Sequence, residues 1–108
     1  MDPQTAKLWF SMQTIPTKIQ VLLNVMKQLT IVFRDIDTTS AIETRLTAAR
    51  SISEINHRLL AFVSASLTSQ PHYPDDVIID LLFDHLEQPA LARHADWVWD
   101  GALSGVGH

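Results

Sequence analysis

Glu54 and His57 have the Glu-x-x-His spacing, which makes them the first candidates for chemistry in this sequence. On a helix this spacing puts both side chains on one face, as in helical bundles that hold metal ions between carboxylates and histidines. Such bundles use the motif twice and add two further carboxylates, whereas here it occurs once. Asp80 and Asp84 could supply oxygen ligands. The sequence therefore leaves a metal-dependent enzyme as an alternative, against the simpler interpretation that Glu54 pairs with a neighbouring arginine at the surface.

Two other pairings of aspartate with histidine are poorly placed for catalysis. Asp84 and His85 are adjacent, so on a helix they point about 100° apart, and His94 and Asp96 diverge still more. The chain has no cysteine, and its glycines all lie in the last eight residues. Acyl transfer by a thiol and phosphate binding by a glycine-rich loop are therefore excluded. We expect no catalytic residue, no cofactor and no metal site.

Charge is divided unevenly along the chain. Residues 1–70 carry seven of the eight Lys and Arg against five acids, and residues 71–108 carry one against seven, so the net charge of −4 is made of about +2 and −6. Clustered like charge costs self-repulsion unless something offsets it. The acidic last third is therefore the expected contact surface for a protein partner, and the charge favours a basic one.

Carboxylates and tryptophans in this last third form two candidate groups. Three aspartates, at 76, 80 and 84, stack along one face of a helix, where ordinary solvation is the alternative to binding. In the segment 96–100 two indoles point about 200° apart on a helix, so we expect one to be partly exposed. Tryptophan is favoured at binding hot spots, although a sandwiched helix would bury both. The predicted partner-binding residues are Asp76, Asp80, Asp84, Asp96, Trp97, Trp99 and Asp100.

Helices must position these side chains, because no glycine precedes Gly101 to form the turns of hairpins. Pro3 and Pro16 are typical of helix starts, and 40–43 has the form of a capping box. Apolar residues at alternating three- and four-residue spacing line the buried sides, including Ile19, Leu22, Met26, Leu29, Phe33 and Ile36, and then Ile42 and Leu46. We expect helices near 3–13, from 15 to between 35 and 40, over 41–68, from 75 onward, and over 89–100 with Gly101 ending the last.

These elements predict an all-α fold, a small bundle of four to five helices with two long central antiparallel helices and two short C-terminal helices. One domain is expected over 1–101, with a flexible tail at 102–108. The second long helix, at about 28 residues, would extend on the order of 40 Å. Two short C-terminal helices cannot cover that length. A homodimer is therefore expected, unless the N-terminal helix folds over the remainder.

Composition narrows the function to a class. No stretch approaches the roughly 18 to 20 apolar residues of a membrane span, and no apolar leader is present, so a cytoplasmic protein is expected. Dispersed basic residues and the net negative charge disfavour nucleic acid. We expect a non-enzymatic protein–protein interaction or regulatory module of the inhibitor, immunity, chaperone or adaptor type. The alternatives are the metal-dependent enzyme described above and a structural domain whose acids meet the basic half of a second copy.

Overall fold

The computed structural model describes residues 2–39, 41–68, 75–89 and 91–103 of the chain. In these ranges it contains five α-helices, one short 3-10 helix and no strand. The predicted all-α bundle with two long central helices and short C-terminal helices is confirmed. The helices are α1 (Pro3–Ser11), α2 (Ile15–Thr39), α3 (Ile42–Leu67), α4 (Asp75–Leu86) and α5 (Ala95–Leu103), with the 3-10 helix η1 (Ala92–His94) before α5.

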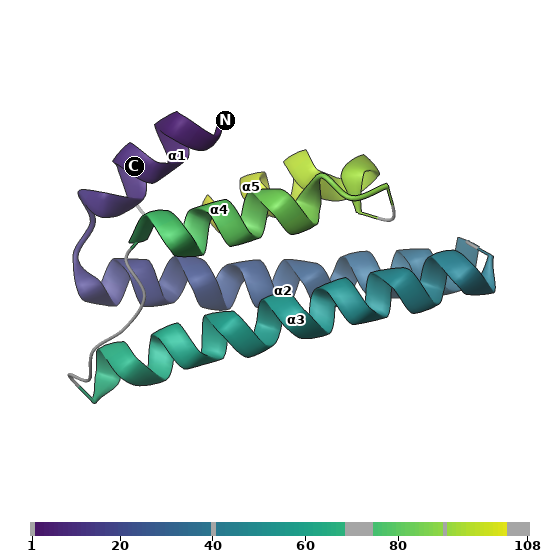
Figure 1. The fold of residues 1–108 in the computed structure, drawn as a ribbon, viewed down its shortest axis with the longest axis horizontal. Helices are drawn as coiled ribbons and strands as arrows, with labels where there is room; N and C mark the ends of the chain where they lie inside the picture. The colour runs from purple at the N-terminus through teal and green to yellow at the C-terminus, as the bar shows by residue number, and fades with distance from the viewer. Residues whose placement is uncertain (1, 40, 69–74, 90, 104–108) are drawn as a thin grey trace.

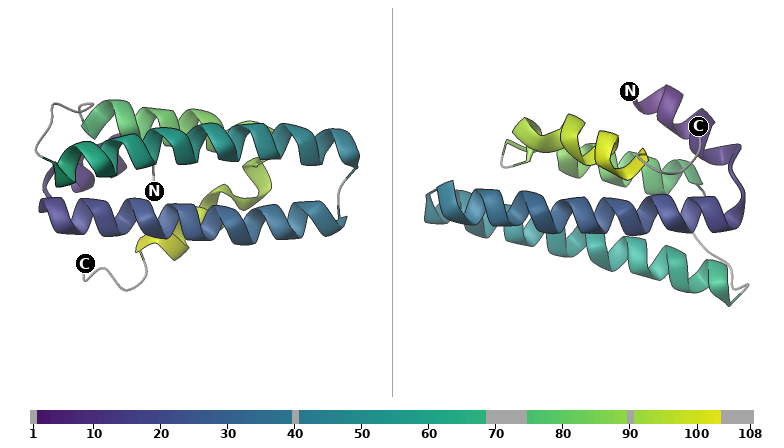
Figure 2. Two further views of the ribbon diagram at one scale, coloured as in Figure 1. Left: turned by 90° about the horizontal axis from the view of Figure 1, so that it is seen from below. Right: turned by 180° about the vertical axis from the view of Figure 1, so that it is seen from behind.

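The helices form two layers. The long helices α2 and α3 lie antiparallel and side by side, and α1, α4 and α5 pack over one face of this pair (Figure 1). In the left view of Figure 2, which is seen from below, α2 and α3 lie in front, and none of the described helices crosses over them. We call the two sides of the α2–α3 pair the covered face and the uncovered face. None of the described helices is long and apolar enough to cross a membrane.

The first helix begins where the sequence predicts. The Thr5 amide donates a hydrogen bond to Asp2 Oδ1 over 2.8 Å, and the Thr5 hydroxyl donates to Oδ2 over 3.0 Å. These two bonds cap α1 and hold the pKa of Asp2 below its ordinary value. At α3 the expected capping box depends on Ser40, which lies outside the described residues. Ala41 occupies the N-cap position there and has no side-chain hydrogen bond.

The core lies between the two layers. In α2, Leu22, Leu29 and Ile36 are buried as expected, and so are three valines, Val21, Val25 and Val32. The other half of the predicted stripe, Ile19, Met26 and Phe33, is only partly buried. The reason is that α2 contacts α5 on one side and α3 on the other, so its buried face is centred on the valine line.

The first turns of α3 correct a second expectation. Ile42 and Leu46 were predicted to be buried, but they are 62% and 56% exposed. Burial on α3 begins at Ala48 and then follows Ile52, Ile55, Leu59 and Phe62. The apolar spacing of α3 therefore continues onto a side that no described helix covers.

The C-terminal helix is also shifted from its predicted position. Pro89 precedes α5 instead of starting it, and α5 runs to Leu103 instead of ending at Asp100. Gly101 lies inside the helix against α2, where a Cβ atom would come within 2.3 Å of the Gln28 side chain. The Asn24 amide of α2 donates to the Ala102 carbonyl over 3.0 Å. Glycine thus serves close packing here, and α2 satisfies a carbonyl near the end of α5.

Candidate functional site

The surface of α5 gathers three of the predicted binding residues. Val98, Trp99 and Ala102 are buried, so the helix presents its opposite side outward. Asp96, Trp97 and Asp100 occupy that side and are all exposed. Asp96 stands in the first turn of α5, where the helix dipole favours negative charge. We call Asp96, Trp97 and Asp100 the acidic indole face.

Trp97 is the partly exposed indole that the spacing predicts, with 45% of its surface accessible. Its ring lies 5.6 Å from the ring of His94, with the two planes tilted by 35°. His94 is itself held by α2, because its Nε2 lies 2.9 Å from Asp35 Oδ2. A buried histidine anchored to the long helix therefore supports one side of the exposed indole.

Trp99 has the opposite environment. It is 5% exposed, and its ring packs 5.6 Å from that of Phe83 in α4. Its indole Nε1 is buried without a hydrogen-bond partner among the described residues. Trp99 therefore joins α5 to the core, and it does not belong to the binding surface on which the sequence analysis placed it.

The acid row of α4 is not a free platform. Asp80 lies 2.7 Å from the Nζ atom of Lys7, so α1 supplies a positive charge within the same chain. Asp84 is exposed and forms no ion pair in the described part of the chain. The side chain of Asp76 lies outside the described residues. Of the predicted acids, Asp84, Asp96 and Asp100 thus remain available to a partner.

The carboxylate and histidine set does not form a metal centre. Glu54 accepts a hydrogen bond from Arg58 Nε over 3.0 Å, which is the surface pairing that the simpler interpretation expects. His57 lines a groove between α2 and α3, whereas Asp80 meets α1. Across the described ranges no three His, Asp or Glu side chains are grouped as metal ligands would be.

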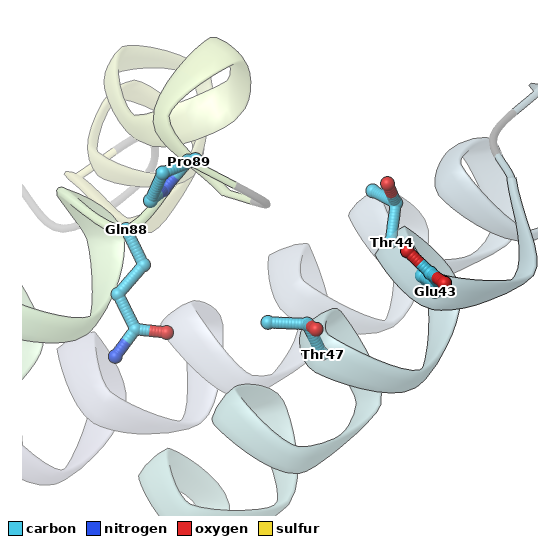
Figure 3. A pocket seen from close by; sticks show the side chains of 5 residues that line it. All are labelled: Glu43, Thr44, Thr47, Gln88 and Pro89. Atoms are coloured by element: carbon cyan, nitrogen blue, oxygen red, sulfur yellow. The ribbon is translucent and has the colours of Figure 1, made fainter.

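A cleft lies between the start of α3 and the end of α4 (Figure 3). It encloses about 440 Å³, and its lining residues are Glu43, Thr44, Thr47, Gln88 and Pro89. Gln88 also accepts a hydrogen bond from the Ser51 hydroxyl, which ties the chain after α4 to α3. Among the described residues of this lining, Glu43 is the one ionisable group.

The uncovered face contains a groove that was not predicted from the sequence. Its volume is about 490 Å³, and α2 contributes Phe33 while α3 contributes the other lining residues, among them Ala49, Asn56, His57 and Leu60. The signal was present in the sequence, because Leu46, Ser53, Leu60 and Leu67 recur every seven residues. That recurrence marks a second line on α3 besides its buried one.

Comparison of the chain with family models, with curated proteins and with solved structures finds no match. The acidic indole face and the uncovered face are therefore the basis for a proposed function.

Proposed function

We propose that this protein is a non-enzymatic protein–protein interaction module that binds a basic protein partner through the acidic indole face. The observation that supports the proposal is the exposure of Trp97 between two exposed carboxylates, Asp96 and Asp100. An indole is a large flat surface that gains by leaving water, and it is enriched at binding hot spots. The proposal includes a regulatory role in the cytoplasm, with which a chain free of cysteine is compatible.

Charge would give this surface its selectivity. Asp96 and Asp100 lie four residues apart on one side of α5, and neither forms an ion pair in the described part of the chain. Lys or Arg side chains of a partner would pair with them at the edge of the contact, while Trp97 fills an apolar pocket at its centre. Such rim charges speed association and make it sensitive to salt.

An affinity experiment in extracts of the native host tests this function. The baits are the intact protein, Trp97→Ala, Asp96→Asn/Asp100→Asn and Leu8→Ala, the last removing a 65% exposed side chain of α1. We expect one basic protein to be retained by the intact bait and by Leu8→Ala, lost from Trp97→Ala, and weakened by the double charge variant. Binding of that protein, once purified, should fall as salt rises. Equal recovery by all four baits would contradict the proposal.

We also propose that the chain forms a homodimer. The support is the apolar character of the uncovered face, where Leu46, Leu60 and Leu67 are each more than half exposed. Large exposed apolar surfaces are uncommon on monomers and are typical of association sites. Light scattering at micromolar concentration should give twice the mass of the chain, and a result at the monomer mass would refute the dimer.

A further inference from the structure

The uncovered face of α3 carries one uncharged line of side chains along the whole helix. Its members follow one another at alternating intervals of four and three residues, which keeps them on one side of a helix. The apolar members are Ile42, Leu46, Ala49, Leu60, Val63 and Leu67. Ser53 and Asn56 stand in the middle, and we call the eight residues the α3 seam. Charged residues of α3 such as Glu43, Arg50 and Glu54 lie off this line.

The seam lies open over most of its length. Ile42, Leu46, Leu60 and Leu67 are 62%, 56%, 55% and 71% exposed, whereas Val63 is buried. The groove beside it is lined by residues of α2 and α3 alone, so none of the described helices covers it. A stripe of this kind normally packs against another helix.

The order of residue types along the seam identifies the helix that fits it. Reversing the seam about its midpoint, between Ser53 and Asn56, pairs Ile42 with Leu67, Leu46 with Val63, Ala49 with Leu60, and Ser53 with Asn56. Every apolar residue then faces an apolar residue, and the polar residues face each other. We infer that the seam binds the α3 seam of a second copy, antiparallel and in this register. The inference rests on the proposed homodimer and deepens it.

Other registers fit less well. Sliding one antiparallel helix by a heptad in either direction sets Ser53 and Asn56 against apolar residues such as Leu46 or Leu60. A polar residue buried against apolar side chains loses its hydrogen bonds to water without replacement. A central polar pair therefore selects one register, as polar core positions do in coiled coils.

Asn56 supplies an independent observation. Its side-chain Oδ1 is buried and has no hydrogen-bond partner in the described part of the chain, and Asn56 lines the groove of the uncovered face. In the proposed register the hydroxyl of the partner subunit's Ser53 faces this amide. Rotation of the Asn56 side chain toward the groove would let that hydroxyl donate to Oδ1, which satisfies the group in both copies by symmetry.

The available area suits a stable dimer. The 26 residues of α3 rise about 39 Å, and two helices side by side are about 20 Å wide. A face of that size is on the order of 800 Å² per copy, which is what each partner contributes to an interface of standard size. A symmetry axis across the middle of the helices would stack α3 on α3 and α2 on α2 of the two copies.

Cysteine crosslinking tests the register directly, because the natural chain has no cysteine. In the variant Ala49→Cys/Leu60→Cys the two thiols of one helix are about 16 Å apart, which is beyond the reach of a short bismaleimide. Across the proposed interface they face each other. We expect covalent dimer from this double variant and loss of that product in Ala49→Cys alone and Leu60→Cys alone.

Two controls make the result specific. Thr47→Cys/Ala61→Cys places exposed thiols at similar heights on another side of α3, and it should give no covalent dimer. Leu60→Glu should convert the dimer to monomer in light scattering, whereas Leu8→Glu on α1 should leave the mass unchanged. Circular dichroism checks that each variant keeps its helix content.

The outcomes separate the register from the dimer. Twice the chain mass together with covalent dimer from Ala49→Cys/Leu60→Cys alone among the double variants supports the proposed seam. Twice the chain mass without that product, or with it from Thr47→Cys/Ala61→Cys, overturns the seam and leaves the homodimer standing. Monomer mass for the natural chain overturns both, while binding of a basic partner through Trp97 is decided separately.

Discussion

The two faces of the α2–α3 pair differ in whether other helices of the chain pack on them. On the covered face, polar contacts join separate elements: His94 meets Asp35, Asn24 meets the Ala102 carbonyl, and Ser51 meets Gln88. On the uncovered face the α3 seam is uncharged, and Asn56 keeps a buried oxygen without a partner in the described residues. The covered face is thus packed by other helices of the same chain, although Trp99 Nε1 there also lacks a hydrogen-bond partner among the described residues. The uncovered face has the features of a surface that a second chain completes.

The largest expected effect comes from breaking the covered face at its aromatic centre. Phe62 of α3 and Phe10 of α1 are fully buried, and their rings meet edge to face at 6.2 Å. Phe62→Ala should lower the free energy of unfolding by about 3–5 kcal/mol, since it removes this contact and leaves a cavity. Urea denaturation measures the loss.

The matched control for Phe62 lies two residues away on the other face. Leu60→Ala truncates a side chain that is 55% exposed in a single chain. At protein dilutions where the chain is monomeric, it should change the unfolding free energy by about 0.5 kcal/mol or less. Comparable losses from the two variants would contradict the division into two faces.

The two histidines of these faces give a smaller contrast. His94 is buried on the covered side and bonded to Asp35, whereas His57 is exposed on the uncovered side. His94→Ala should cost about 1–2 kcal/mol, because a partly buried hydrogen bond is lost. The fluorescence of Trp97 should shift toward that of a solvated indole. His57→Ala should leave both quantities nearly unchanged. An unshifted emission in His94→Ala would mean that His94 does not support Trp97.

The close packing of α5 on α2 at Gly101 gives a smaller effect on stability, which tests the covered face in more detail. Alanine is a better helix former than glycine by roughly 0.5–1 kcal/mol, but a Cβ at Gly101 meets the Gln28 side chain at 2.3 Å. Gly101→Ala should therefore gain little or lose stability in the natural background, and gain about 0.5–1 kcal/mol in a Gln28→Ala background. A double-mutant cycle from urea denaturation measures this coupling. Equal gains in both backgrounds would show that the two residues do not meet.

The number of helices and the positions of α1 to α4 followed from signals within a few residues, whereas the position of α5 did not. Prolines marked the starts of α1 and α2, and apolar spacing marked the long pair. The extent of burial did not follow, because Ile42 and Leu46 have the same spacing as the buried residues of α3. Whether such a stripe is buried depends on which helix lies over it, and that depends on how far α4 and α5 reach.

The candidate site was also predictable only in part, because residue spacing shows which side chains share a face but not which face is covered. The 200° separation of Trp97 and Trp99 predicts one exposed indole, but only the docking of α5 on α2 and α4 selects Trp97. Likewise, the spacing of Asp80 and Asp84 predicts a shared face, while the pairing of Asp80 with Lys7 depends on the return of α1 over α4. Contacts between residues far apart in the chain therefore decide which indole is exposed and which aspartate is paired.

The smallest expected effect is at the start of α1, where the N-cap residue Asp2 makes the stability of the covered face depend on pH. The hydrogen bond from the Thr5 amide, and then that from its hydroxyl, lower the pKa of Asp2 in the folded chain. The folded state therefore binds fewer protons at Asp2 than the unfolded state, and stability rises with pH in the interval between the two pKa values. The contribution is complete above the unfolded pKa and is lost as pH falls through the folded one.

Asp2→Asn keeps a capping oxygen but cannot titrate in this range. The difference in unfolding midpoint between the natural chain and Asp2→Asn should shrink or reverse in acid, and a difference that stays constant with pH would show that the Asp2 carboxylate does not stabilise α1.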